Sequence, residues 1–244
     1  MDRKIDGWHS PRLNKYMEIV TYGYYGFPLL MFPTAAADYL EYERFLMLDV
    51  ITSYIDSGKV KVFSINSINN ESWLNRQVPA KYKGIRQQQY NGYITEEVVP
   101  YIWNSCNSKV GIITTGASLG AFHAANQLFR RPDLFDGTIA MSGAYDIRGY
   151  YHDEYYDENI YFNNPVDYLP NLNDSHYLNL LRQKSHIHLL TGQGDYENPN
   201  ASRRMAGILA QKGIPFELDL WGYDMPHDWP TWRKMLPYYI DSRF

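Results

Sequence analysis

The stretch Thr114–Ala121 (TTGASLGA) decides how this chain folds. It contains the pattern Gly-x-Ser-x-Gly, between an apolar run at residues 110–115 that is typical of a strand and a helical pattern at residues 118–130. A serine on such a sharp strand-to-helix turn presents its hydroxyl at the end of a sheet, and the flanking glycines let strand and helix pass closely. We therefore expect Ser118 to be a nucleophile. The alternative is a glycine-rich turn whose serine only caps the helix.

Short apolar runs alternate with longer helical patterns on both sides of this stretch. We predict strands at residues 17–22, 28–32, 60–65, 110–115, 138–141, 186–190 and 216–220, and helices at 41–57, 96–104, 118–130, 201–211 and 229–239. Strands that alternate with helices of crossover length predict a mostly parallel central sheet with helices on both faces. No repeat or linker interrupts the pattern, so we expect residues 1–244 to form a single domain.

Residues 148–174 depart from this regularity. They follow the strand after the Ser118 helix and are rich in tyrosine, asparagine and acidic residues, including Asp153, Glu154 and Asp167. Their aromatic content favours a packed, lid-like insertion over one end of the sheet. If the acids face the site entrance they disfavour anionic acyl groups; the alternative is a solvated acidic surface over core tyrosines. The basic stretch at residues 76–86 is interpreted as a solvated loop.

Composition excludes several classes of protein. The chain has 23 Lys and Arg against 27 Asp and Glu, a net charge of −4, which argues against a nucleic-acid partner. Its one cysteine, Cys106, excludes an internal disulfide and a cysteine-based zinc site. The apolar run at residues 27–32 is too short for a signal or a membrane span. We expect a soluble, cytoplasmic protein without a membrane partner, metal or cofactor. Its 23 tyrosines leave homo-oligomerisation open.

A serine nucleophile needs a base, and His227 has the expected position. It lies between the last predicted strand and the last predicted helix, where the chain order Ser, acid, His places the base. His123, His186 and His188 lie inside a predicted helix or strand, so structural packing is expected for them. Nothing nominates the remaining three, His9, His152 and His176.

The acid that orients the histidine should follow the second-last strand. The segment Thr191–Pro199 (TGQGDYENP) offers two carboxylates there. We expect Asp195, because it directly follows the glycine turn at the strand end, with Glu197 as the alternative.

The oxyanion of a tetrahedral intermediate needs two backbone N–H donors. Leu119 supplies one, as the residue after the nucleophile. The second is expected from the run of small residues after Phe32, at Ala35 or Ala36.

Several segments resemble the esterase family of α/β-hydrolases that includes esterase D, the enterochelin esterases and the mycobacterial mycolyltransferases. They are Phe32–Thr34, Gly116–Gly120 with Ala124–Asn126, Arg131–Phe135 and, most specifically, His227–Trp232 (HDWPTW). The resemblance extends over nearly the whole chain. It implies the α/β-hydrolase fold and a triad of Ser118, His227 and either Asp195 or Glu197, since some relatives use glutamate.

Together these features predict a serine esterase that acts on a small-molecule ester through an acyl-enzyme. An acyltransferase would use the same acyl-enzyme and pass it to an alcohol or amine instead of water. A binding protein on a hydrolase scaffold, with misaligned triad residues, is the alternative from another class. The sequence does not identify the substrate.

Overall fold

A computed structural model describes residues 1–151 and 155–244. Its centre is one eight-stranded sheet in the order β1-β2-β4-β3-β5-β6-β7-β8. The strands are β1 (Arg3–Ser10), β2 (Lys15–Tyr22), β3 (Phe27–Phe32), β4 (Val60–Ile65), β5 (Ile112–Ala117), β6 (Phe135–Met141), β7 (His186–Thr191) and β8 (Glu217–Leu220). β1 and β2 form an antiparallel hairpin and β2 pairs antiparallel with β4, whereas every pair from β4 to β8 is parallel. The predicted mostly parallel sheet is confirmed.

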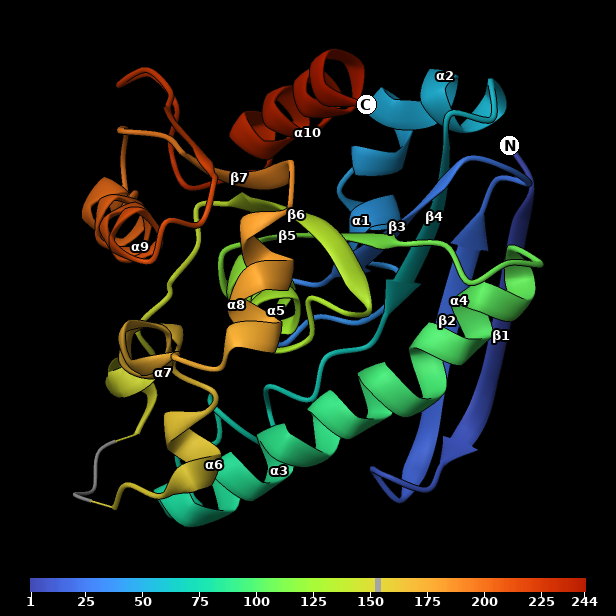
Figure 1. Ribbon diagram of the computed structural model, residues 1–244. Helices are drawn as coiled ribbons and strands as arrows, with labels where there is room; N and C mark the ends of the chain where they lie inside the picture. The colour runs from blue at the N-terminus through green and yellow to red at the C-terminus, as the bar shows by residue number, and fades with distance from the viewer. Residues whose placement is uncertain (152–154) are drawn as a thin grey trace.

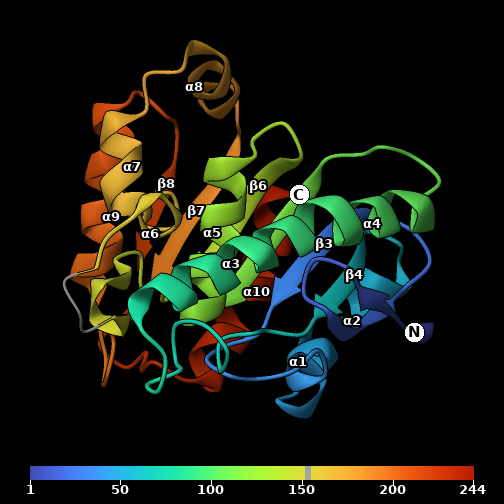
Figure 2. The ribbon, with the colours of Figure 1, turned by 90° about the horizontal axis from the view of Figure 1, so that it is seen from below.

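Helices cover both faces of the sheet because the central strands are apolar on both sides. In β3, Leu29 and Met31 belong to one core, and Leu30 and Phe32 to the other. The first core is covered by α1 (Glu41–Arg44), α2 (Met47–Asp56) and α10 (Trp229–Arg243), and the second by α3 (Ala80–Tyr93), a π-helical turn (Ile94–Val98), α4 (Val99–Ser105), α5 (Leu119–Arg130) and α9 (Pro199–Gln211). Figure 1 shows α2 and α10 together on one side of the sheet, and Figure 2 shows α3 and α4 running across the other.

Three local predictions differ from the structure. Residues 41–57 form two helices and not one, because Leu46 between them has a left-handed backbone, with φ of 60°. The basic stretch is not a loop: it enters α3, and Lys83 is buried and donates to Tyr150 O at 2.6 Å. Strand β1 was not predicted, and its largely exposed residues explain why it gives little apolar signal.

The insertion after β6 contains a 3₁₀ turn (Ile147–Tyr150) and the helices α6 (Glu158–Tyr161) and α7 (Pro165–Asn171), and it is followed by α8 (Ser175–Arg182). It is bonded to the body of the protein. Buried Asn163 accepts from Asn91 Nδ2 of α3 at 2.7 Å, and Tyr168 donates to Asn126 Oδ1 of α5 at 2.8 Å. These contacts fasten the segment to two helices of one face.

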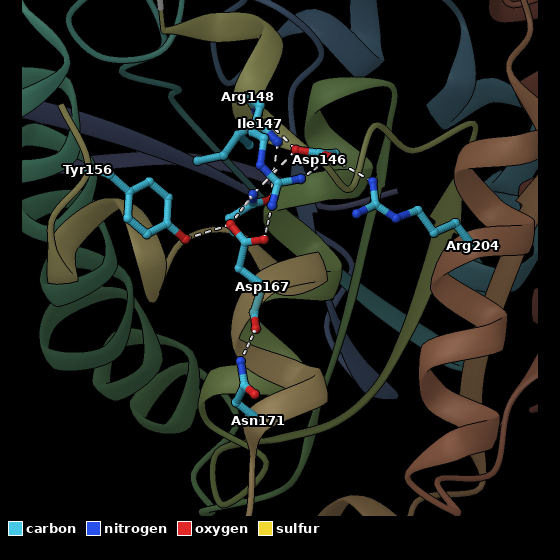
Figure 3. A network of polar contacts seen from close by, with 8 residues as sticks. Asp146, Ile147, Arg148, Tyr156, Asp167, Asn171 and Arg204 are labelled. Carbon is cyan, nitrogen blue, oxygen red and sulfur yellow. Dashed lines mark hydrogen bonds and ion pairs between the residues drawn. The ribbon is translucent and has the colours of Figure 1, made fainter. Parts of the chain in front are cut away.

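Asp167 of the insertion and Asp146 just before it are paired with arginines. Arg148 contacts Asp167 and also Asp146, the latter at 2.7 Å, and Arg204 of α9 reaches Asp146 at 2.6 Å (Figure 3). The two arginines balance the charge of the two aspartates, so this cluster presents no acidic excess. His152, Asp153 and Glu154 lie outside the described residues.

Candidate active site

Four neighbouring strands end together at one edge of the sheet. Ala117 of β5 lies opposite Met141 of β6, Met141 opposite Leu190 of β7, and Thr191 opposite Leu220 of β8. The residues that follow these strands therefore meet at the carboxyl edge, where open α/β sheets bind their ligands.

Ser118 occupies a strained turn between β5 and α5. Its backbone has φ of 57° and ψ of −123°, a conformation that non-glycine residues rarely adopt. The glycines on either side make the turn possible: a Cβ on Gly116 would lie 2.3 Å from the backbone of Gly120, and one on Gly120 would lie 2.3 Å from Phe32 O. The half-buried Ser118 is thus held at the sheet edge, between β5 and the loop that follows β3.

His227 is paired with Glu197 and not with Asp195. His227 Nδ1 lies 3.3 Å from Glu197 Oε2, and the Glu197 side chain is only 1% exposed. Asp195 is exposed, and it contacts His227 through its backbone, whose carbonyl accepts from His227 N at 2.9 Å. Tyr196 between them has φ of 63°, a left-handed bend between the exposed and the buried carboxylate. The expectation for Asp195 therefore does not match the geometry, and the alternative acid does.

The Glu197 carboxylate accepts several hydrogen bonds besides that of His227. The donors are Ser142 Oγ at 2.5 Å, Thr191 Oγ1 at 3.1 Å and the backbone N of Gly192 at 3.2 Å. Burial by itself would raise the pKa of Glu197, but the hydrogen bonds from His227 and Ser142 outweigh it and hold that pKa below its ordinary value. The carboxylate is therefore charged at neutral pH, as an acid that stabilises an imidazolium requires.

Trp232, the last residue of the segment His227–Trp232 (HDWPTW), contacts both the base and a partner of the acid. Its ring lies edge-on to His227, with centroids 5.1 Å apart, and its Nε1 donates to Ser142 Oγ at 3.0 Å. The same side chain thus packs against the base and orients the hydroxyl that bonds the acid Glu197. Sequence reasoning missed Ser142; its position directly after β6, beside the predicted acid loop, is a signal that points to it.

The candidate oxyanion donors lie on both sides of Ser118. Leu119 is the first residue of α5, so its N–H has no partner within the helix. Across from it, residues 34–37 form a turn closed by Ala37 N donating to Thr34 O at 3.2 Å. In the described part of the chain, the N–H groups of Ala35 and Ala36 donate no hydrogen bond. An oxyanion donor at one of these two residues therefore stays a prediction.

The buried Glu41 holds the start of this turn. It accepts from Thr34 N at 2.7 Å and from Thr34 Oγ1 at 2.5 Å, and burial raises the pKa of Glu41.

No hydrogen bond joins Ser118 Oγ to His227 among the described residues; in unliganded enzymes this bond is often long and forms with the substrate.

Two further histidines, His188 and His186, have structural surroundings. His188 Nδ1 lies 3.0 Å from Glu217 Oε2, and His186 stacks on Phe244 with centroids 4.3 Å apart. Residues 1–151 and 155–244 contain no group of three His, Cys, Asp or Glu arranged to hold a metal ion. Within the same ranges, every helix is too short or too polar to cross a membrane.

Comparisons with known proteins agree with this architecture. A sequence model of the prolyl oligopeptidase family matches residues 104–221, which include Ser118 and Glu197 and end before His227. None of the curated proteins compared matches the chain.

Solved structures match over nearly the whole chain. A ferulic acid esterase is 18% identical, with a TM-score of 0.69 over 98% of both chains. The S-formylglutathione hydrolase FrmB from Staphylococcus aureus is 16% identical, with a TM-score of 0.73 over 98% of this chain and 97% of the other. The ferulic acid esterase AmCE1/Fae1A from Anaeromyces mucronatus is 14% identical, with a TM-score of 0.68 over 99% and 90%. These matches confirm the predicted α/β-hydrolase fold.

Proposed function

We propose that this α/β-hydrolase is a serine carboxylic ester hydrolase with Ser118 as nucleophile, His227 as base and Glu197 as acid. The observation that carries the proposal is the pairing of His227 with a buried, fourfold hydrogen-bonded carboxylate at the edge where Ser118 occupies its strained turn. A carboxylate so placed fixes the imidazole with its proton on Nδ1, which leaves Nε2 free to accept the serine proton.

The reaction then proceeds through an acyl-enzyme. Ser118 Oγ attacks the ester carbonyl while His227 Nε2 takes its proton, and the C–O bond to the alcohol breaks as His227 returns that proton to the leaving oxygen. The N–H of Leu119 and one from the Ala35–Ala36 turn stabilise the oxyanion. Water, activated by the same histidine, then releases the acid and regenerates Ser118.

Ester chemistry is supported by the structures that this chain resembles, two of which carry the name esterase. The substrate we infer is a small-molecule carboxylic ester or thioester. The prolyl oligopeptidase match makes an amide substrate the competing possibility to measure.

Fluorophosphonate labelling read by intact mass tests the proposal. We expect one adduct on the wild-type chain, none on Ser118→Ala or His227→Ala, and an unchanged adduct on the control Asp195→Asn. An unlabelled, folded wild-type chain would reject the triad and favour the binding-protein alternative.

A second assay separates the possible reactions. We would measure initial rates on p-nitrophenyl acetate, on a peptide p-nitroanilide, and on p-nitrophenyl acetate with added glycerol as acceptor. Hydrolysis of p-nitrophenyl acetate should be the main activity. Faster turnover of the anilide would indicate a peptidase. Acyl glycerol as the main product would indicate an acyltransferase.

A further inference from the structure

A chain of hydrogen bonds links the interior of α5 to the Ala35–Ala36 turn. Asn69, in the loop after β4, donates from Nδ2 to Ala35 O, and its Oδ1 lies 2.8 Å from His123 Nε2. Asn69 is fully buried and His123 is 1% exposed. Neither residue has a role in the triad, so their placement needs a separate explanation.

The carbonyl oxygen of Ala35 decides which atom donates and which accepts in each of these hydrogen bonds. A carbonyl oxygen only accepts, so the amide nitrogen of Asn69 must face Ala35 and its oxygen must face His123. His123 therefore carries its proton on Nε2. Burial lowers the pKa of His123 to about 3, so the ring is neutral, and its Nδ1 has no partner among the described residues. Within residues 1–151 and 155–244, the one hydrogen bond of the His123 ring is thus directed at Asn69.

The bond to Ala35 O acts on a whole peptide group. In a planar trans peptide the N–H of Ala36 points opposite to the C=O of Ala35, so holding this oxygen also fixes the direction of that N–H. Glu41 holds Thr34 and Ser67 Oγ donates to Ala37 O at 2.8 Å, so both ends of the turn have their own bonds. Asn69 holds the middle.

Helix α5 contacts the same loop a second time. Gly120, on the first turn of α5, lies against Phe32 O and Pro33 O so closely that a Cβ would be 2.3 and 2.7 Å from them. His123 lies one turn further along the helix. Helix α5, which carries the Leu119 N–H, therefore contacts the loop after β3 on two successive turns: directly at Gly120, and through Asn69 at His123.

We infer that His123 and Asn69 are positioning residues, which set the Ala35–Ala36 peptide against the Leu119 N–H so that the two sides form one oxyanion site. The inference rests on the proposed function. A donor displaced by about 1 Å costs on the order of 100-fold in rate, which gives the scale of the expected effect.

Asn69→Leu and His123→Phe test the inference, with Ser72→Ala as control. Ser72 is buried in the same segment, and among the described residues its hydroxyl bonds only Ile68 O. On p-nitrophenyl acetate, we expect Asn69→Leu to lower kcat by about 10- to 100-fold with KM changed less than about threefold, because the loss falls on the transition state. The pH midpoint of activity should stay at the wild-type value. The control should match the wild type.

The double variant Asn69→Leu/His123→Phe tests whether His123 acts on Ala35 through Asn69, an arrangement we call the relay, or whether the two residues have independent packing effects. If His123 acts only through Asn69, adding His123→Phe to Asn69→Leu lowers kcat no further. It also replaces both partners of one hydrogen bond by apolar groups, which helps the variant to fold. Additive losses, a shifted pH midpoint, or wild-type kcat in Asn69→Leu would each overturn the inference.

A measurement that does not depend on activity separates this inference from the proposed function. Nitrogen-15 spectra of the His123 ring should show a neutral Nε2–H tautomer in the wild type, and loss of that single state in Asn69→Leu. A wild type inactive on esters but with this tautomer would reject the esterase and retain the relay. An Nδ1–H tautomer would reject the relay whatever the activity.

Discussion

Replacing Glu197 by glutamine tests the assignment of the acid most directly, because it removes the charge and keeps the shape. The fixed backbone N–H of Gly192 and the hydroxyl of Ser142 both donate to Glu197 Oε1. The glutamine oxygen satisfies these donors only at that position, so the NH₂ group takes the place of Oε2 and faces His227 Nδ1. An amide that donates to Nδ1 holds the ring proton on Nε2, which then cannot accept the proton of Ser118.

The expected size of the effect follows from this wrong tautomer. Comparable loss of the carboxylate in a serine protease lowers kcat about 10⁴-fold, so we expect a decrease of about 10³- to 10⁴-fold, or about 4–5.5 kcal/mol of activation free energy. KM should change little, because Glu197 is buried behind the histidine and does not face the substrate.

Steady-state kinetics on p-nitrophenyl acetate measures the effect, with Asp195→Asn as the matched control. Asp195 is exposed, and among the described residues it bonds His227 only through its backbone carbonyl, which asparagine retains, so we expect kcat within about threefold of the wild type. Thermal melts establish that both variants fold. The reasoning is refuted if Asp195→Asn loses activity by orders of magnitude while Glu197→Gln retains it.

Four further variants follow, three of them near the site and one, Gly207→Ala, on α9. Gly120→Ala should lower kcat by about 100-fold, because its Cβ meets backbone oxygen at 2.3 Å and α5 must shift. A Cβ added to Gly207 on α9 meets no neighbouring atom within 4 Å in the described part of the chain, so Gly207→Ala should raise the unfolding free energy by about 0.5–1 kcal/mol in urea titrations. Trp232→Phe keeps the aromatic contact and loses the donor to Ser142, so kcat should fall by about 3- to 10-fold; an unchanged kcat would show that this bond is dispensable. Because folding lowers the pKa of His123 to about 3, its stabilising contribution is complete above the unfolded value near 6.5 and is lost as the pH falls toward 3. His123→Phe should therefore flatten the decrease of unfolding free energy between pH 6 and 4, by up to about 1.4 kcal/mol per pH unit, and equal slopes would contradict this.

The sequence determined the parts of the fold that depend on local pattern. Apolar strands buried on both faces have a continuous signal, which is why the predicted ranges overlap β2 to β8. Strand β1 lies at the sheet edge with exposed side chains, and α3 has a polar composition, so neither shows the pattern that strands or helices usually have. One face of α3 is buried by distant segments: Ile160 of the insertion packs at Gly84, and Tyr90 and Tyr93 belong to the main core. The local periodicity of a sequence does not predict contacts between segments that are far apart in it.

The same distinction applies to the site. Ser118 and His227 were predicted because chain order and flanking glycines identify them. The choice between Asp195 and Glu197 depends on the left-handed backbone of Tyr196, with φ of 63°. A tyrosine rarely adopts this conformation, so the residue type does not predict it. Contacts between loops support that bend: Gly194 N donates to the carbonyl of Met225 at 3.0 Å. The acid is therefore selected by how two loops meet.

Backbone strain is concentrated where these loops meet. Among the described residues, six other than glycine have positive φ, and three of them, Ser118, Ser142 and Tyr196, lie at or beside the proposed triad. Each such residue costs about 1–3 kcal/mol and persists only where its surroundings enforce it. Here the enforcing contacts are hydrogen bonds to the sheet: Ser118 N donates to Met141 O at 2.9 Å and Ser142 N to Leu190 O at 2.7 Å. Under the proposed function, this strain holds the nucleophile Ser118 and the acid Glu197 in fixed directions.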